Sequence, residues 1–417
     1  MKVLWLGGIV LPLIAEKEKI RIEFKNGWLI KLSESLKKDN QIDLVYVFDS
    51  KYYITGETDY YKYYGIERRT PSTVRLGNEY IESAKNILKT ENPEIIHIWG
   101  TERPHTLAMI EAANQLGISD RVVVSVQGLV SKCYYHYCAY IPYKVAKGHT
   151  LRDFFQGNVL KKQENFKVRG EYEIEALQSV NNVIGRTDWD RACIWDINPK
   201  ANYHYNNETL RDEFYTGQWN ISNCIPHSIF ISQSDYPLKG LHLVLEAMPK
   251  IIDQFPDTHL YIAGKNHLSQ PKWKRTRYEE YLFTLIKRYQ LEKHISFTGN
   301  LSAKEMKERL LNSNVFVCAS SIENSPNSLG EAMLLGLPCV ATNVGGIPSL
   351  LVHGKEGFLY PADETYMLSY YICKLFYSAD LSKFMGDNAR KRALITHNPQ
   401  KNQNDLLAIY KMIKGNS

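Results

Sequence analysis

Two glutamates in one short stretch of the chain have the residue type and spacing of a ligand-binding site. Glu323 stands in a polar loop, and Glu331 follows eight positions later in "LGEAMLLG", a pattern typical of a helix. The preceding run "VFVCAS" is typical of a buried strand, so the loop leads from the carboxyl end of a strand into the amino end of a helix. Such edges of open α/β sheets bind ligands, and the free N–H groups of the helix favour an anion. Because carboxylates accept hydrogen bonds from hydroxyl groups, the pair predicts a ligand that is polyhydroxylated and phosphorylated.

Each of these glutamates also has an ordinary explanation. Glu331 could be a first-turn glutamate that the helix dipole stabilises, and Glu323 could be a surface acid of the loop. For either residue alone we prefer that explanation. The occurrence of both in one loop-to-helix setting favours a binding site.

A lysine and two glycines occupy further loops of this kind. Lys239, in "SQSDYPLKGLHLVLEAM", lies between an apolar run and a helical pattern, where a lysine can neutralise a phosphate; an exposed turn is the alternative. Gly7 and Gly8 follow the first apolar run, where they either allow a ligand to approach the backbone or form a tight turn. The dinucleotide-binding pattern G-x-G-x-x-G is absent from that loop.

These loops require a scaffold in which strands and helices alternate. Apolar runs typical of strands recur in two series, separated by stretches with helical periodicity. The first series is 2–6, 43–48, 94–99, 121–126 and 181–185, and the second is 227–232, 259–264, 294–299, 315–320, 338–343 and 357–360. The alternation predicts an α/β fold with two doubly wound domains, each with a parallel sheet covered on both sides.

The length of 417 residues agrees with two domains, because it exceeds what one hydrophobic core usually organises. We expect a first domain over residues 1–222 and a second over 223–399, since the stretch 195–226 is polar and lacks sustained periodicity. A last amphipathic helix, over residues 400–417, has no later element to pair with and is expected to pack back on the first domain. Seven widely spaced cysteines without a C-x-x-C pair predict reduced thiols and a cytoplasmic protein.

One segment, residues 132–169, has eight Lys/Arg against two acids, with eight aromatic residues interleaved. Rings and cations together suit an anionic membrane surface, which predicts a peripheral protein at the inner membrane face. A solvated loop with ordinary surface charge explains the segment about as well. Nucleic-acid binding is disfavoured, because no recognition helix, zinc spacing or aromatic sheet motif accompanies the charge. The apolar first fifteen residues are interrupted by Gly7, Gly8 and Pro12, so we prefer a buried strand to a signal peptide.

Glu323 and Glu331 with the following "AMLLGLPCVATNVGGIPSLLVHGKEGFLYP" resemble the retaining glycosyltransferases of family 4, which have two facing Rossmann-like domains, the GT-B fold. The similarity extends upstream through "FTGNLSAKEMKERLLNSNVFVCAS", "HLYIAG" and "KGLHLVLEAM". It covers the second expected domain almost completely and is weaker in the first.

The resemblance implies a nucleotide-sugar donor on the second domain and an acceptor that enters from the first. It implies that Glu323 holds hydroxyls of the transferred sugar, Glu331 the ribose hydroxyls, and that Lys239 neutralises the diphosphate. Further implied positions are the backbone N–H groups of Asn327, Ser328 and Leu329 at the diphosphate, Gly299 and Asn300 at the nucleobase, and Gly7 and Gly8 closing over the donor from the opposite domain.

The chain departs from the family pattern at several positions. Gln233 and Ser234 stand where an arginine commonly grips the diphosphate, so donor binding must depend more on Lys239 or on another cation such as Lys265. Gln127 stands where histidine is common, and we assign no general base.

The resemblance implies transfer of a hexose-like sugar from a nucleoside diphosphate to a hydroxyl acceptor with retention of configuration. The expected acceptor is a glycan or lipid-linked glycan of bacterial surface polysaccharide synthesis. The chain has no aspartate-based metal motif, so neither a metal ion nor another cofactor is expected. Two alternatives stay open: a sugar-nucleotide epimerase on the same fold, and a non-catalytic glycan- or lipid-binding protein with a decayed site.

Overall fold

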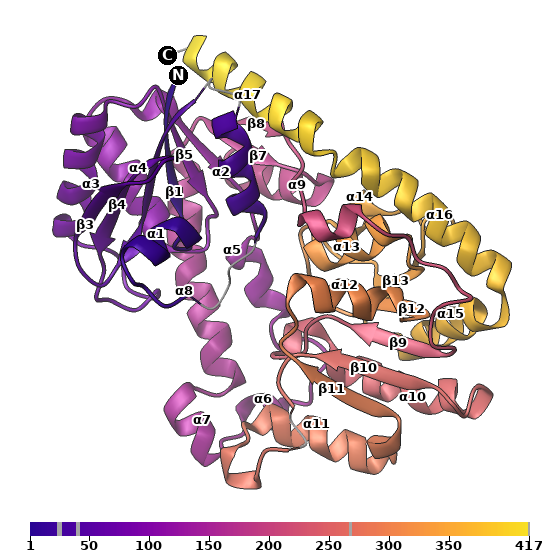
Figure 1. Cartoon of the computed structure of the whole chain (residues 1–417). Helices are drawn as coiled ribbons and strands as arrows, with labels where there is room; N and C mark the ends of the chain where they lie inside the picture. The colour runs from indigo at the N-terminus through magenta and orange to yellow at the C-terminus, as the bar shows by residue number, and fades with distance from the viewer. Residues whose placement is uncertain (23–26, 39–41, 267–268, 416–417) are drawn as a thin grey trace. The chain divides into compact units, whose positions relative to one another are not determined.

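The computed structural model describes residues 1–22, 27–38, 42–266 and 269–415, and the chain forms two compact units. Each unit is built around a sheet with helices on both faces (Figure 1). Unit 1 comprises residues 1–132, 165–209 and 398–417, and unit 2 comprises residues 133–164 and 210–397. The predicted class of two Rossmann-like doubly wound domains is thereby confirmed.

Unit 1 contains an eight-stranded sheet in the order β3-β4-β2-β1-β5-β6-β7-β8. All neighbouring strands are parallel except β3 and β4. Its strands are β1 (Lys2–Gly7), β2 (Asp43–Ser50), β3 (Ile54–Glu57), β4 (Lys62–Glu67), β5 (Ile95–Trp99), β6 (Val122–Ser125), β7 (Asn182–Gly185) and β8 (Asn202–Tyr205). Its helices are α1 (Pro12–Lys17), α2 (Trp28–Lys38), α3 (Asn78–Glu91), α4 (Pro104–Gln115), α5 (Val130–Cys133), α8 (Val159–Gln178), which starts in unit 2, α9 (Asp188–Ile197) and α17 (Pro399–Gly415).

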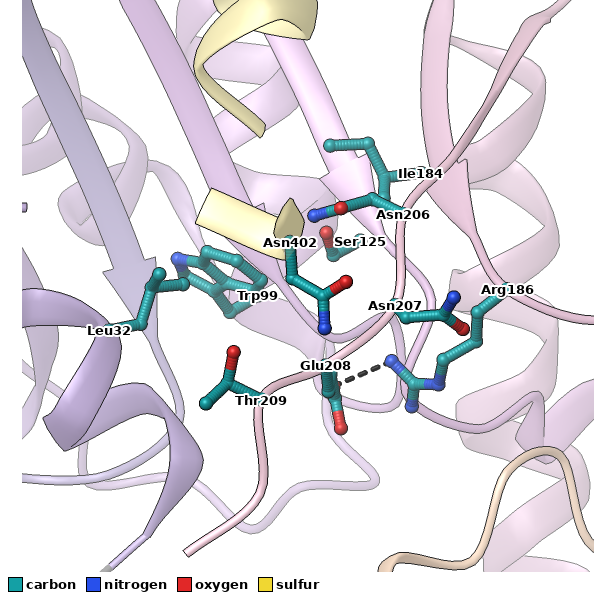
Figure 2. Close-up of a pocket in the computed structure, with 10 residues that line it drawn as sticks. All are labelled: Leu32, Trp99, Ser125, Ile184, Arg186, Asn206, Asn207, Glu208, Thr209 and Asn402. Atoms are coloured by element: carbon teal, nitrogen blue, oxygen red, sulfur yellow. Dashed lines mark hydrogen bonds and ion pairs between the residues drawn. The ribbon is translucent and has the colours of Figure 1, made fainter. Parts of the chain in front are cut away.

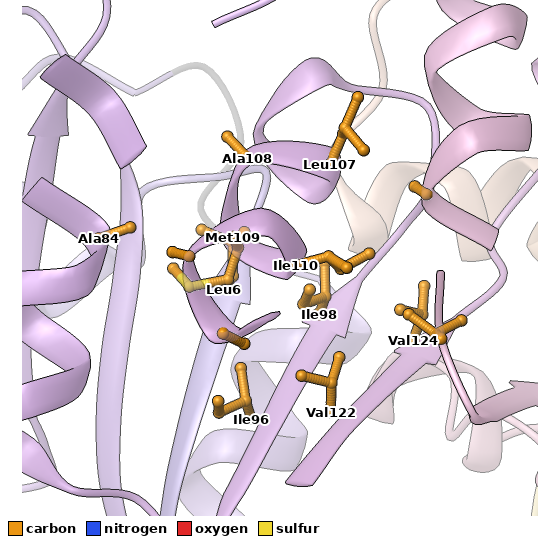
Figure 3. Close-up of a cluster of buried hydrophobic side chains, with 14 of the residues drawn as sticks. Leu6, Ala84, Ile96, Ile98, Leu107, Ala108, Met109, Ile110, Val122 and Val124 are labelled. Atoms are coloured by element: carbon orange, nitrogen blue, oxygen red, sulfur yellow. The ribbon is translucent and has the colours of Figure 1, made fainter. Parts of the chain in front are cut away.

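The first strand shows how this sheet is buried on both faces. Side chains alternate along a strand, so Leu4 and Leu6 enter one hydrophobic cluster whereas Val3 and Trp5 enter the other. Figure 3 shows part of the first cluster, in which α4 covers β5 and β6. Burial on both faces explains why these strands appear in the sequence as continuous apolar runs.

Unit 2 contains a six-stranded parallel sheet in the order β11-β10-β9-β12-β13-β14. Its strands are β9 (Ser228–Ile231), β10 (His259–Ala263), β11 (Ile295–Gly299), β12 (Val315–Cys318), β13 (Cys339–Thr342) and β14 (Phe358–Tyr360). Its helices are α6 (Tyr143–Lys147), α7 (Leu151–Gln156), α10 (Leu241–Gln254), α11 (Arg277–Arg288), α12 (Ala303–Leu311), α13 (Asn327–Leu335), α14 (Ile347–Leu350), α15 (Thr365–Tyr377) and α16 (Ala379–Thr396). No helix in the described part of the chain combines the length and apolar character needed to cross a membrane.

The division between the units differs from the boundary expected after residue 222. Unit 1 ends at Thr209, because β8 pairs with β7 in the first sheet and the short helix η3 (Asp212–Tyr215) packs on α13 of unit 2. Residues 133–164, expected in the first domain, belong to unit 2. Local polarity does not reveal these attachments, because contacts with distant parts of the sequence create them. Residues 416 and 417 of the expected last helix lie outside the described residues.

The last helix, α17, belongs to unit 1, where Tyr410 is completely buried. Its hydroxyl accepts a hydrogen bond from Trp5 Nε1 at 3.0 Å and lies 2.5 Å from His97 Nδ1. His97 Nε2 in turn lies 2.7 Å from Ser125 Oγ, and burial holds the pKa of His97 well below its usual value. These bonds join α17 to strands β1, β5 and β6.

We expect Tyr410→Phe to lower the free energy of unfolding by about 1–3 kcal/mol, because the buried Trp5 N–H then loses its acceptor. Equilibrium urea unfolding measures this change. The matched control is Met412→Ala on the same helix, whose side chain is 55% exposed and which should change stability by less than about 0.5 kcal/mol. Equal effects of the two substitutions would contradict the role of the Tyr410 hydroxyl.

Candidate functional site

Two loops of unit 2 meet at the carboxyl edge of its sheet. They follow β9 and β12, which are neighbouring strands, so both loops emerge at the same place. The N–H of Ser321 donates to the carbonyl of Leu238 at 2.8 Å. Gly240 has φ +73°, and a Cβ there would lie 1.9 Å from the carbonyl oxygen of Ala319. The loops can therefore approach this closely only with glycine after Lys239.

The approach brings Lys239 and Glu323 into an ion pair. Glu323 Oε1 accepts from Lys239 Nζ and, at 2.8 Å, from Ser320 Oγ. Burial acts to lower the pKa of Lys239, but the negative charge of Glu323 outweighs it and holds that pKa above its usual value. Lys239 therefore stays protonated. Among the described residues no hydrogen-bond partner meets Glu323 Oε2.

The backbone of Glu323 is fixed by the turn that follows β13. The N–H of Gly346 donates to the Glu323 carbonyl at 2.9 Å. Gly345 has φ +52°, and a Cβ there would lie 2.0 Å from the same oxygen. The two glycines of "NVGGIP" thus position a carboxylate that lies more than twenty residues earlier in the chain.

The second glutamate, Glu331, forms a different pair. Arg211 Nε and Nη2 donate to its two carboxylate oxygens, both at 2.7 Å, in a bidentate arrangement. Glu331 is almost completely buried, and this burial raises the pKa of its carboxyl despite the opposing effect of Arg211. Arg211 also lies 4.8 Å from the ring centroid of Phe214. The two predicted carboxylates thus each have a cation, and the two ion pairs share no residue.

The helix that carries Glu331 begins at Asn327, two residues before the expected start near Leu329. Pro326 is its N-cap and provides no side-chain hydrogen bond, while its carbonyl accepts from the N–H of Leu329 at 3.0 Å. Asn327 and Ser328 are half-buried in the first turn. The first N–H groups of a helix lack partners within the helix, so this terminus can receive an anion.

The remaining residues of unit 2 that are expected to contact the sugar donor lie at or just after the carboxyl ends of β9, β10 and β11. Gly299 ends β11 with φ +74° and open space where a Cβ would point, and Asn300 beside it is exposed. Gln233 is exposed. Lys265 pairs with Glu279 at 2.5 Å, and Glu279 also closes the capping box of α11. The cation suggested as a substitute for the missing arginine is therefore already engaged.

Gly7 and Gly8 belong to unit 1, where they follow β1. A Cβ on Gly7 would lie 2.0 Å from the hydroxyl of Tyr46, which donates to the Ile9 carbonyl at 2.7 Å. A Cβ on Gly8 would lie 3.3 Å from the guanidinium of Arg103. The packing of Tyr46 is sufficient reason for glycine at position 7, and the closing of both glycines over a donor stays a prediction.

Unit 1 has a polar pocket of about 380 Å³, counting space open to solvent, at the carboxyl ends of β5, β6 and β7 (Figure 2). Buried Arg186 donates to Glu208 at 2.6 Å and to Gln127 Oε1 at 3.3 Å. Arg186 Nε and Asn206 Oδ1 are buried and have no hydrogen-bond partner among the described residues. The lining residues are Leu32, Trp99, Ser125, Ile184, Arg186, Asn206, Asn207, Glu208, Thr209 and Asn402.

Buried polar groups normally have partners, so Arg186 Nε and Asn206 Oδ1, unpaired within the described part of the chain, are unusual features behind the pocket lining. In the sequence, Gln127 departs from the family pattern and Arg186 directly follows the predicted strand 181–185, but no motif marks Asn206 or Glu208. The same is true of Arg211, which lies in the stretch without periodicity. Only the folded chain brings these residues to the carboxyl edges of the sheets.

Part of the basic aromatic segment supports the loops of unit 2. Ser321 Oγ donates to the carbonyl of His136 at 3.0 Å. Tyr137 is buried and stacks on Tyr236 with ring centroids 6.2 Å apart, and Tyr236 lies beside Lys239 with 5.7 Å from Nζ to its ring centroid. This part of residues 132–169 is therefore interior, unlike the exposed surface expected for the whole segment.

Part of unit 2 matches a family of known proteins. Residues 226–392 match the family described as Glycosyl transferases group 1. A putative glycosyltransferase of Bacillus subtilis, YtcC, is 32% identical over 157 residues, which are 37% of this chain and 38% of that protein. The putative colanic acid biosynthesis glycosyltransferase WcaL of Salmonella typhimurium is 34% identical over 137 residues, 31% of each chain. The chain thus matches well under half the length of these relatives.

The whole chain is also similar in fold to a solved structure. The Anabaena protein Alr3699/HepE, in complex with UDP-glucose, aligns over 99% of this chain and 100% of its own with a TM-score of 0.67 at 15% identity. The two-domain fold agrees with the GT-B fold that the sequence resemblance implies. Residues 226–392, which make up most of unit 2, match a glycosyltransferase family, as the sequence predicts for the second domain.

We expect Gly240→Ala to destabilise unit 2 more than Gly354→Ala does. Both glycines have similar positive φ, +73° and +76°, so both substitutions carry a backbone cost of about 1–2 kcal/mol. Only at Gly240 would the new Cβ meet a carbonyl oxygen, whereas Gly354 has open space. Urea unfolding of the two variants measures the difference, and equal losses would show that the close loop contact contributes nothing.

Proposed function

We propose that the protein is a retaining glycosyltransferase that moves a hexose-like sugar from a nucleoside-diphosphate sugar to a hydroxyl acceptor. The observation that carries this proposal is the Lys239–Glu323 pair beside the amino end of α13, at the carboxyl edge of the sheet in unit 2. The Arg211–Glu331 pair adds a second carboxylate from the same helix.

Each of these groups has a role in donor binding under this proposal. Glu323 Oε2 accepts from hydroxyls of the transferred sugar, and the first N–H groups of α13, at Asn327 and Ser328, face the diphosphate. Glu331 accepts from the ribose hydroxyls while it keeps Arg211, since a carboxylate offers about four lone-pair sites. Gly299 and Asn300 line the nucleobase pocket.

The chemical task is to stabilise the charge that develops on the departing diphosphate. Lys239 is protonated and held in place before the donor arrives, so its charge needs little reorganisation during the reaction. Retention of configuration follows if the leaving phosphate oxygen takes the acceptor proton on the same face of the sugar. This route needs no side chain as general base, in keeping with glutamine at position 127.

Two of the comparisons support the choice of substrates. The Anabaena structure of the same fold contains UDP-glucose, which favours a nucleoside-diphosphate hexose as donor. The WcaL relative is named for colanic acid biosynthesis, which favours a glycan or lipid-linked glycan as acceptor. We place the acceptor hydroxyls in the pocket of unit 1, whose lining includes the polar side chains of Asn207, Thr209 and Asn402.

We expect Lys239→Ala to lower kcat by about 100-fold or more, because the leaving diphosphate loses its nearest cation. Transfer is measured with the nucleotide sugar that raises the melting temperature most in a thermal-shift screen. Lys304→Ala, an exposed lysine at the start of α12, is the matched control and should transfer normally.

A second variant separates catalysis from stability. Lys239→Met with Glu323→Gln removes both charges, so no charge is left unpaired in the loops, and we expect a native melting curve with transfer still abolished. Near-normal sugar transfer by Lys239→Ala would contradict the assignment of Lys239 to the leaving diphosphate. An altered sugar in NMR spectra after incubation with donor alone would indicate an epimerase instead.

A further inference from the structure

Helix α7 of unit 2 is held rigidly by its inner face. Thr150 and Asp153 form a capping box at its start, and Thr150 Oγ1 also donates to the Arg275 carbonyl at 2.8 Å. The N–H of Arg277 donates a hydrogen bond to Asp153 Oδ2 at 2.8 Å, so a buried carboxylate joins α7 to the first residue of α11. Figure 1 draws α7 close to α6 and α11. The outer face of α7 therefore has a defined orientation on the unit.

That outer face is strongly apolar. Leu151, Phe154 and Phe155 have i, i+3 and i+4 spacing, which places them on one side of the helix. Their exposed fractions are 70%, 81% and 82%. The adjoining short helix η5 (Lys272–Lys274), in contact with α7, adds Trp273 at 64%. We call these four side chains, with the cations around them, the α7–η5 surface.

The exposed charged side chains of the segments that carry these rings have one sign. Exposed cations come from α6, α7 and η5, namely Lys144, Lys147, Arg152, Lys272 and Lys274. Within residues 143–156 and 271–275 the only acid is Asp153, which faces inward. Lys274 Nζ lies 4.8 Å from the ring centroid of Trp273, so cation and ring are presented together. The sequence alone could not associate Trp273 with this surface.

We propose that the α7–η5 surface docks on an anionic phospholipid bilayer, with its rings in the interfacial region and its cations among the headgroups. Aromatic and aliphatic side chains bordered by lysine and arginine are the composition that partitions to such an interface. The surface attracts anionic lipid, whereas a second copy of the chain would bring like charges together.

Single-stranded nucleic acid is the other partner that rings and cations can bind. Bases stack on aromatic rings that offer their faces. Phe154 and Phe155 meet edge to face, at 89° with centroids 5.5 Å apart, so they offer no common stacking plane. Insertion of rings into a lipid interface requires no common plane, and the observed arrangement favours the bilayer.

Exposure of an aromatic ring is not by itself unusual on this protein. Trp195 on α9 is 71% exposed, and the same helix exposes Asp188, Arg191 and Asp196. This helix therefore lacks the excess of cations that accompanies the rings of α7. Trp195 therefore provides a matched control for ring exposure without the positive charge.

Sedimentation of the full chain with lipid vesicles tests the proposal. Neither the sugar donor nor the sugar acceptor is added. We expect binding to vesicles of phosphatidylglycerol and phosphatidylcholine in equal parts, falling with added salt, and little binding to phosphatidylcholine alone. Phe154→Ser with Phe155→Ser should weaken binding about tenfold or more, since each ring contributes buried apolar area. Lys272→Glu with Lys274→Glu should weaken binding and flatten its salt dependence.

The controls are Trp195→Ser and Lys304→Glu, which should bind as the unchanged chain does. Melting curves establish that each variant is folded. Equal sedimentation with both kinds of vesicle, or unchanged binding by the double phenylalanine variant, overturns the proposal. The proposal is also overturned if the chain is a dimer that the double substitution Phe154→Ser with Phe155→Ser dissociates. Binding of a single-stranded oligonucleotide without binding of vesicles would overturn it as well. Calorimetric titration with UDP in parallel tests the donor site separately, so either proposal can fail alone.

Discussion

The candidate site depends on one contact, the ion pair between Lys239 and Glu323 on neighbouring loops of unit 2. A charge removed from water is costly unless an opposite charge compensates it, so each side chain of this pair holds the other in place. Glycine at 240 and 345 allows the backbone approach that makes the pair possible. The arrangement keeps a protonated lysine beside a helix amino end before any ligand is present. An anionic ligand therefore meets charge that is already positioned.

The buried carboxylate of Glu331 is also compensated by an opposite charge, from an arginine that no sequence motif indicates. Glu331 is buried inside α13, and Arg211 reaches it from a segment more than one hundred residues earlier. Without that guanidinium, burial would disfavour the ionised form of Glu331 still more strongly. The two acids that look equivalent in the sequence thus differ in environment: Glu323 keeps an oxygen available, whereas both oxygens of Glu331 are engaged by arginine.

One continuous segment, residues 133–164, serves two purposes in unit 2. Its first part contributes Tyr137 to the packing behind Tyr236 and Lys239. Its later part forms α7, which buries Asp153 and exposes Phe154. Composition alone treats all these aromatic residues and cations as one class. These residues differ in burial because each turn of the segment packs on the rest of unit 2 with one side only. Which side packs inward depends on partners such as Arg277, whose N–H binds Asp153.

The sequence by itself determined the two α/β domains, because strands buried on both faces must be apolar runs and the helices between them must have one apolar face. It also indicated that Glu323, Glu331 and Lys239 lie at the carboxyl edge of a sheet, since loops after parallel strands gather at one edge. Strands β3, β4 and β8, the boundary at Thr209 and the partners Arg211, Arg186 and Trp273 were decided only by the tertiary structure. The local pattern of apolar and polar residues indicates which side of a helix or strand is buried. It does not indicate which distant residue forms the ion pair or the packing contact. That choice is made when the chain packs, because an ion pair or a strand pairing stabilises only the arrangement in which both partners are present.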